Sequence, residues 1–219
     1  MITVYLVRHG ETFLNQLNRM QGWINSELSQ KGVRQALTVG QILAPLSFDG
    51  VFCSDLPRAI QTRNLILSQL TTPIQYQITT PNLREVNFGS FDGLPSSEVW
   101  STIASSTSFI DQEDIILHEG MSKVRSLMNK ADPRKLAETY SSVIKRWQST
   151  ESLIHSTFNN CDAKILIVSH GTFIRTISEY YGANIYQNFP SNAGITVLQM
   201  NNRHTQLVKY NQSLYSEEP

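Results

Sequence analysis

The run Thr3-Val4-Tyr5-Leu6-Val7 is short, apolar and rich in β-branched residues, and it leads directly into Arg8-His9-Gly10. This pattern predicts a strand that is buried on both faces, as in a parallel sheet. A second run of the same kind, Ile165-Leu166-Ile167-Val168, leads into Ser169-His170-Gly171. Two buried strands that each end close to a histidine and a glycine therefore form the centre of the predicted fold.

Stretches with helical spacing of apolar residues alternate with strand-like runs along the chain. Helices are expected at about residues 31–43, 57–69, 132–147 and 171–181, and further strands at 50–53, 74–78, 193–200 and 204–210. Ser54 and Asp55 before Pro57, and Asp132 before Pro133, are typical of helix starts. The alternation predicts an α/β fold: a three-layer, mostly parallel, doubly wound sheet with helices on both faces.

The length of 219 residues is compatible with one domain over residues 1–219. Residues 87–106 are rich in Gly, Ser and Pro, so loops and short helices are expected there. The stretch at about 96–134 interrupts the strand–helix alternation. We interpret it as an insertion that folds over one edge of the sheet and caps the active site.

Composition excludes several classes of protein. Hydrophobic residues make up 40% of the chain, which is enough for a core, and the formal net charge is zero. A nucleic-acid or membrane partner would leave a basic footprint, so neither is expected. Cys53 and Cys161 form no CxxC pair and are interpreted as buried small hydrophobes. With no leader peptide recognised, a cytoplasmic location is expected.

The ends of the two buried strands predict an anion site. Ligands of open α/β sheets bind outside the carboxyl ends of the strands, where His9 and His170 would lie. If Gly171 begins a helix, its N–H groups and dipole favour an anion. Arg8 and Arg58 can add two guanidinium groups that match phosphate geometry. No HExxH motif or aspartate cluster supports a metal site, and no cofactor is expected.

Four blocks of the chain carry these residues. They are Arg8-His9-Gly10-Glu11-Thr12 with Asn15, then Ser54–Thr62, then Leu83-Arg84-Glu85 with Phe88-Gly89 and Asp92-Gly93, and finally Val168-Ser169-His170-Gly171. In this order they resemble the motifs of the histidine phosphatase superfamily, also called the phosphoglycerate mutase-like family. Gln21-Gly22-Trp23 matches the segment between the first two blocks.

The resemblance implies a role for each matching residue. His9 would attack phosphorus and carry the phosphoryl group, and Glu85 would protonate the leaving oxygen and later take a proton from water. Arg8, Arg58 and His170 would neutralise the phosphoryl oxygens. The remaining phosphate- or substrate-binding residues would be Asn15, Gln21, Gly22 and Gly171. Such an enzyme works without a metal.

The family contains both mutases and phosphatases, and the segment after Glu85 favours a phosphatase. Val86–Ser122 contains no Lys or Arg and six acidic residues, so we expect an acidic cover that repels a polyanion. The predicted enzyme is a phosphomonoesterase that forms a phosphohistidine and acts on a small phosphorylated metabolite. The alternatives are a cofactor-dependent phosphoglycerate mutase and a non-catalytic phosphate-binding protein.

Overall fold

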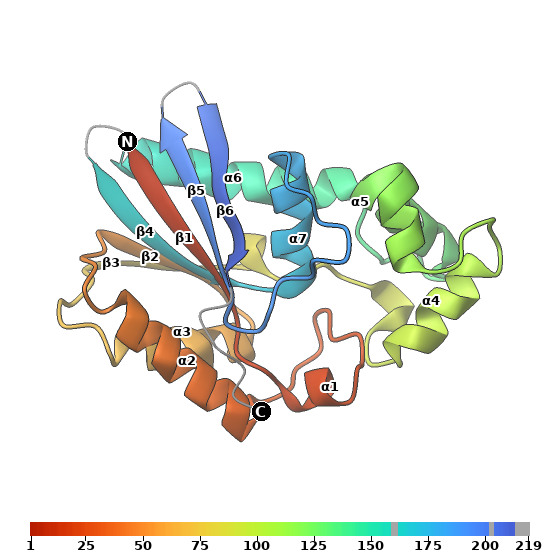
Figure 1. Ribbon diagram of the computed structural model, residues 1–219, viewed down its shortest axis with the longest axis horizontal. Coiled ribbons are helices and arrows are strands. Elements are labelled where there is room, and N and C mark those ends of the chain that lie inside the picture. Colours follow the sequence, from red (N-terminus) through yellow and green to blue (C-terminus); the bar gives the residue numbers. More distant parts are fainter. Residues whose placement is uncertain (159–161, 202–203, 213–219) are drawn as a thin grey trace.

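A six-stranded sheet in the order β3-β2-β4-β1-β5-β6 forms the centre of the computed structural model, which describes residues 1–158, 162–201 and 204–212 (Figure 1). The strands are β1 (Ile2–Arg8), β2 (Gly50–Ser54), β3 (Tyr76–Thr80), β4 (Ala163–Ser169), β5 (Ile195–Asn201) and β6 (His204–Gln212). The helices are α1 (Phe13–Gln16), α2 (Gln30–Leu43), α3 (Pro57–Leu67), α4 (Ser96–Ala104), α5 (Gln112–Ala131), α6 (Tyr140–Phe158) and α7 (Gly171–Tyr180). Two 3₁₀ turns, η1 (Pro81–Leu83) and η2 (Gly89–Phe91), complete the elements.

The sheet is mostly parallel, as the sequence predicts. β3, β2, β4 and β1 pair in parallel, whereas β5 pairs antiparallel with both β1 and β6. Every residue of β2 is buried, and so are six of the seven residues of β4. Strands buried on both faces belong in a sheet covered by helices on both sides, which is the three-layer α/β fold expected from the sequence.

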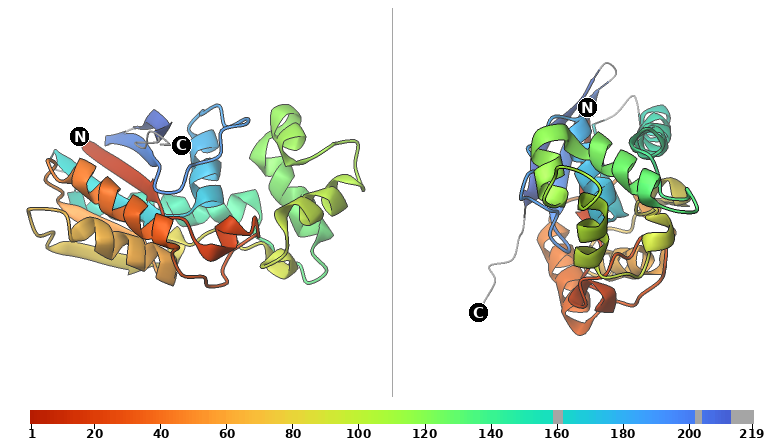
Figure 2. Two further views of the ribbon diagram at one scale, coloured as in Figure 1. Left: turned by 60° about the horizontal axis from the view of Figure 1, so that its bottom comes forward. Right: turned by 90° about the vertical axis from the view of Figure 1, so that its right-hand side faces the viewer.

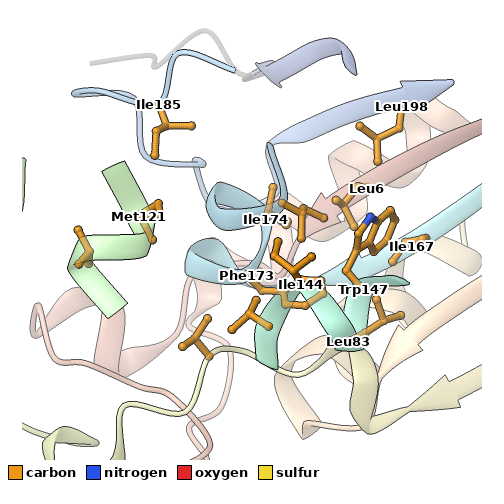
Figure 3. Close-up of a cluster of buried hydrophobic side chains, with 14 of the residues drawn as sticks. Leu6, Leu83, Met121, Ile144, Trp147, Ile167, Phe173, Ile174, Ile185 and Leu198 are labelled. Atoms are coloured by element: carbon orange, nitrogen blue, oxygen red, sulfur yellow. The ribbon is translucent and has the colours of Figure 1, made fainter. Parts of the chain in front are cut away.

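Two apolar cores lie on opposite faces of the sheet. α2 and α3 cover one face, and α6 and α7 cover the other (Figure 1). Figure 3 shows the second core, in which Trp147 of α6 packs among Leu6 of β1, Ile167 of β4 and Phe173 of α7. The Trp147 and Phe173 rings meet edge to face at 6.5 Å, which favours one arrangement of α6 against α7. This packing fixes the start of α7 beside the carboxyl ends of β1 and β4.

The predicted insertion forms a cap made of α4 and α5. Outside the cap itself, α5 packs mainly against α6 and α7. The cap lies on the far side of α7 from the sheet (Figures 1 and 2). The expectation that it folds over an edge of the sheet is therefore wrong. The apolar face of α5, with Ile115, Met121, Val124 and Met128, instead joins the α6–α7 core. The cap thus stands over the carboxyl ends of the strands.

Asp132-Pro133 does not begin a helix. Asp132 ends α5, and its carboxylate accepts hydrogen bonds from the backbone N–H groups of Arg134, Leu136 and Ala137. Burial opposes ionisation of Asp132, but a hydrogen bond from Ser90, together with these backbone donors, holds its pKa well below its usual range. Lys135 has a φ of 54°, which interrupts helical geometry, so α6 begins only at Tyr140.

The start of α3 also differs from the prediction. Pro57 occupies the first turn as expected, but the N-cap residue is Leu56, without a side-chain cap. Ser54 Oγ accepts the N–H of Leu56, and Asp55 pairs with Arg84 through two hydrogen bonds of 2.6 and 2.7 Å. Neither polar residue before Pro57 therefore serves as the N-cap of α3, and Asp55 instead binds Arg84 in the loop after β3.

The remaining strands and Cys53 follow the prediction closely. β3 begins at Tyr76, two residues after the predicted start, and β5 and β6, which correspond to the strands expected at 193–200 and 204–210, pair antiparallel. Asn202, between these two strands, lies outside the described residues, as does Cys161. Cys53 is fully buried in β2, as expected for a small apolar side chain. Within the described ranges, no helix is both long and apolar enough to span a bilayer.

Candidate active site

His9 lies directly after β1 with its ring buried. Nδ1 of His9 is 2.7 Å from the carbonyl oxygen of Gly10. Because a carbonyl oxygen only accepts hydrogen bonds, Nδ1 carries the proton and Nε2 keeps its lone pair. Burial, together with the positive charges of Arg58 and Arg8, holds the pKa of His9 well below its usual range. The arrangement therefore presents a neutral imidazole whose nucleophilic nitrogen is unprotonated.

Two buried arginines flank this nitrogen. Arg58, on the first turn of α3, places Nε 3.3 Å from His9 Nε2, and its other nitrogens donate to the carbonyls of Gly22 and Ile24. Arg8 donates one N–H to the carbonyl of Pro190. Burial lowers the pKa of each guanidinium to about 10, so both remain cationic at neutral pH. Among the described residues neither guanidinium forms an ion pair with a carboxylate, and two such desolvated cations favour binding of an anion.

The ring of His170 lies next to that of His9, with ring centroids 5.1 Å apart. Its Nε2 is 2.7 Å from Ser54 Oγ, a hydroxyl that already accepts the N–H of Leu56. When the Ser54 hydroxyl donates to Nε2, the His170 proton lies on Nδ1, which has no hydrogen-bond partner among the described residues. Burial lowers the pKa of His170 well below its usual range, with the charge of Arg58 adding to the effect. His170 therefore offers a neutral N–H donor.

Three buried nitrogens of this site find no hydrogen-bond partner within the described part of the chain. They are Arg8 Nε, His170 Nδ1 and Gln21 Nε2. Buried donors are almost always paired in folded proteins, and leaving one unpaired costs about 1–3 kcal/mol. Three such donors, contributed by residues that the sequence already assigned to one site, indicate a pocket built for an oxyanion.

Glu85 is held against the start of α7. Its carboxylate accepts the backbone N–H groups of Thr172 and Phe173 at 3.1 and 2.8 Å, and that of Val86 at 2.8 Å. The indole of Trp23 donates to the Glu85 carbonyl at 2.7 Å. These contacts fix a carboxyl group on the same cavity wall as His9, so Glu85 is positioned to exchange a proton with a group bound there.

A cavity of about 320 Å³ joins most of the predicted residues. Its wall includes Arg8, His9, Asn15, Gln21, Arg58 and Glu85. The cavity is concave and mixed in polarity, which is typical of a small-molecule site. The sequence analysis thus selected residues from β1, α1, α3 and the loop after β3 that the fold brings to one place.

Gly22 and Gly171 do not line the cavity but contact residues that do. Gly22 has a φ of 47°, and its carbonyl accepts a hydrogen bond from Arg58. A Cβ on Gly22 would lie 1.9 Å from the Asp92 carboxylate. A Cβ on Gly171 would lie 2.7 Å from the Phe189 ring and 3.0 Å from Arg8 Nε. Both glycines therefore permit close approach of neighbouring groups, a structural role that accompanies the ligand-binding role expected for them.

Several wall residues had no sequence signal. Asn192 Nδ2 donates to the His9 carbonyl and to Asn15 Oδ1, and Phe189 stacks on the Arg8 guanidinium at 5.1 Å. Both come from the loop between α7 and β5, where no motif marks them. Arg19 also lines the cavity, and it adds a cation that precedes Glu85 in the chain. The cap contributes Ser96, Trp100 and Gln112.

The acidic cover does not face the catalytic cavity. Of the acidic residues within Val86–Ser122, none lines its wall, where Glu85 is the carboxylate present among the described residues. Asp111 instead caps α5 and Glu113 pairs with Arg175. Within the catalytic cavity, repulsion by the acidic cap residues is therefore not what distinguishes substrates. The part of the cavity wall that the cap contributes consists of Ser96, Trp100 and Gln112, and none of these side chains is a cation.

The described residues contain no cluster of three or more His, Cys, Asp or Glu side chains able to hold a metal ion. The chemistry that the site itself can offer is covalent and electrostatic. A free imidazole nitrogen can attack phosphorus, guanidinium and N–H donors can take up the charge on the phosphoryl oxygens, and a carboxyl can move a proton.

Comparisons with known proteins bear on the family and the fold. A 2,3-bisphosphoglycerate-dependent phosphoglycerate mutase from Blochmanniella floridana is 33% identical over 199 residues, covering 82% of each chain. The crystal structure of phosphoglycerate mutase from Bacillus anthracis str. Sterne has a TM-score of 0.86 and 29% identity, covering 96% of this chain and 92% of its own. An alpha-ribazole phosphatase from Shigella flexneri shares the fold, with a TM-score of 0.68, 23% identity and 96% coverage of each chain.

A model of the histidine phosphatase superfamily, branch 1, matches residues 4–213. That match spans all four sequence blocks and the elements that carry His9, Arg58, Glu85 and His170. The chain therefore belongs to branch 1 of the histidine phosphatase superfamily.

Proposed function

We propose that the protein is a metal-independent phosphomonoesterase that acts on a small phosphorylated metabolite through a phosphohistidine at His9. The observation that carries the proposal is the unprotonated Nε2 of His9, which lies on the wall of a cavity lined also by Arg8, Arg58 and Glu85. A neutral nucleophile beside fixed cations is suited to attack a phosphate dianion.

The proposed reaction has two steps. In the first, the His9 Nε2 lone pair forms a bond to phosphorus while the bond from phosphorus to the ester oxygen breaks, and Glu85 supplies the proton that the leaving oxygen takes up. In the second, water attacks the phosphorus of the phosphohistidine while the bond from phosphorus to His9 Nε2 breaks and returns its electron pair to that nitrogen, Glu85 accepts a proton from the water, and inorganic phosphate leaves. Arg8, Arg58 and the free N–H of His170 stabilise the charge on the phosphoryl oxygens in both steps.

Hydrolysis is favoured over mutase activity by the cap. A bisphosphorylated acid has two further anionic groups besides the transferred phosphate, and each needs a cation or a set of donors. The cap places Ser96, Trp100 and Gln112 on the cavity wall, and Val86–Ser122 contains no Lys or Arg. A substrate with one phosphate fits this wall better than one with several anionic groups.

A mutase is the second candidate, because a relative of 33% identity bears the name 2,3-bisphosphoglycerate-dependent phosphoglycerate mutase. Arg19 gives this candidate one cation beyond Arg8 and Arg58 on the cavity wall. A mutase would interconvert phosphoglycerate isomers faster than it releases phosphate, and the exchange would depend on 2,3-bisphosphoglycerate. A non-catalytic phosphate-binding role would leave His9 unphosphorylated under all conditions.

The experiment compares hydrolysis of phenyl phosphate with isomerisation of phosphoglycerate, both in the presence of a chelator. We expect hydrolysis that resists the chelator, and a loss of about 10³-fold or more in His9→Ala. His204→Ala, at the exposed start of β6, is the matched control and keeps its activity. Chelator-sensitive hydrolysis, hydrolysis that survives in His9→Ala, or isomerisation that outpaces hydrolysis would each contradict the proposal.

A further inference from the structure

A second cavity, of about 650 Å³, lies within the cap between α4 and α5. Ser96, Trp100 and Gln112 line both this cavity and the catalytic one. The two spaces therefore meet at these three side chains. A substrate whose phosphate lies at His9 would have to pass Trp100 to reach the second space, and the combined volume exceeds the needs of a phosphate and one or two carbons.

The second cavity is lined by hydroxyl groups and aromatic rings. Ser97, Ser101, Ser105 and Thr107 contribute side-chain hydroxyls, and Phe109 adds a ring to that of Trp100. The hydroxyls of Ser105 and Thr107 already donate to the carbonyls of Thr102 and Ala104, so these two can only accept from a ligand. A hydroxyl can both donate and accept hydrogen bonds, so a set of them suits a ligand that carries hydroxyls itself. Aromatic rings give such a ligand apolar surface to pack against.

The charge of the second cavity is small and negative. No Lys, Arg or His lines it in the described part of the chain, while Asp111 and Glu113 do. Both Glu113 oxygens bind Arg175 Nη2 at 2.7 Å, which balances that carboxylate. Asp111 Oδ1 accepts the N–H of Asp114 and remains without a cationic partner there. An anionic group placed in this space would meet a negative charge and no cation.

We propose that the second cavity is the subsite for the leaving group of the substrate, and that it selects an uncharged, hydroxyl-rich group of about the size of a sugar over an anionic one. The inference rests on the proposed phosphatase function, whose reacting phosphate it takes as the anchor. The substrate class would then be sugar or polyol monophosphates, with the ester oxygen near Glu85 and the carbon skeleton beyond Trp100.

Three six-carbon phosphates that differ in the charge they carry besides the phosphate test whether the second cavity selects an uncharged leaving group. Glucose 6-phosphate is neutral apart from its phosphate, 6-phosphogluconate adds a carboxylate, and glucosamine 6-phosphate adds an amine. Calorimetric titration of His9→Ala measures their binding without turnover. We expect glucose 6-phosphate to bind about tenfold more tightly than 6-phosphogluconate and within about tenfold of glucosamine 6-phosphate. Equal binding of the first two, or a preference of more than about tenfold for the amine, would overturn the proposal.

A gain of function locates the selection in the second cavity. Ser101→Arg, combined with His9→Ala, places a cation in that cavity and should tighten 6-phosphogluconate binding about tenfold. Thr102→Arg is the matched control, because Thr102 is the next residue of α4 and lines neither cavity. The control should leave 6-phosphogluconate binding unchanged. The same tightening in both variants, or in neither, would overturn the proposal.

Hydrolysis of phenyl phosphate by the unsubstituted protein separates the two proposals. If phenyl phosphate is not hydrolysed but His9→Ala still discriminates between the three sugar phosphates, the phosphatase function fails and the leaving-group subsite stands as a binding site. If phenyl phosphate is hydrolysed but the sugar phosphates bind alike, the subsite proposal fails alone.

Discussion

Nε of Arg58 lies 3.3 Å from Nε2 of His9 and donates to the nitrogen that would attack phosphorus. The hydrogen bond requires that nitrogen to be unprotonated, in agreement with the contact of Nδ1 with the Gly10 carbonyl. Arg58 thus has two effects in the resting site. It orients the imidazole, and its charge disfavours the imidazolium form.

The pH dependence of His9 phosphorylation should reflect this contact. Since the pKa of His9 lies well below the usual value of about 6.5, we expect no loss of phosphorylation rate as the pH falls through that value. Arg58→Met removes one of the two charges that lower the pKa, so the acid limb should move to higher pH. Rapid-quench assays of phosphohistidine formation between about pH 4.5 and 8 measure the acid limb in the unsubstituted protein and in Arg58→Met. An acid limb at the same pH in both proteins would contradict this account of Arg58.

His170→Gln should change how stability depends on pH. The pKa of His170 is lowered in the folded protein, so below about pH 6.5 the unfolded chain binds a proton that the folded one does not. Stability contributed by neutral His170 is therefore present above that pH and is lost as the pH falls. The difference in unfolding free energy between the parent protein and His170→Gln should decrease by about 1.4 kcal/mol per pH unit below about pH 6. Urea denaturation measures it, and parallel curves would contradict the prediction.

Arg125→Met should stabilise the protein. Arg125 of α5 is fully buried, and its Nε and Nη1 have no partner in the described ranges. Burial lowers its pKa to about 10, and its guanidinium lies 5.2 Å from the ring of Phe88. Methionine is apolar and of similar length, so the free energy of unfolding should rise by about 1–4 kcal/mol. Arg125→Ala, which leaves a cavity, should gain less. A lower midpoint of denaturation for the methionine variant would show that the cation is paired in solution.

Gly171→Ala should impair catalysis through two neighbours. The added Cβ would lie 2.7 Å from the Phe189 ring and 3.0 Å from Arg8 Nε, so one or both must move. Displacement of a phosphate-binding guanidinium by a fraction of an ångström should lower kcat/KM by about 10–100-fold. If the contact with Phe189 is the cause, Phe189→Ala in the same chain should restore part of the loss, and the double-mutant cycle measures the coupling. Additive losses would place the cause elsewhere.

The sequence predicted the elements whose signals are local. The buried runs that became β1 and β4, the spacing of α2 and the Pro57 start of α3 all follow from period and composition. His9, Arg8, Arg58 and Glu85 could be assigned because each stands within a recognisable block, and the structure brings them to one cavity. Their catalytic roles stay predictions until they are measured.

What the sequence could not predict depends on tertiary contacts. Asp132 resembles a helix cap, but the loop after α5 supplies more amide donors to its carboxylate than a helix start would. Phe189 and Asn192 carry no local signal, because their roles arise only when the loop before β5 folds back on Arg8 and His9. The orientation of the acidic cap residues likewise follows from the packing of α5 on α6 and α7.

The most direct test of the central claim is a rapid-quench reaction with a phosphomonoester in ¹⁸O-labelled water, followed by mass spectrometry of the protein and of the released phosphate. We expect a phosphoryl group on His9 that is acid-labile and stable in alkali, formed before phosphate appears, and inorganic phosphate with one oxygen from the labelled water. Phosphate released without a phosphorylated His9, or a phosphoryl group that passes to an organic acceptor and not to water, would contradict it.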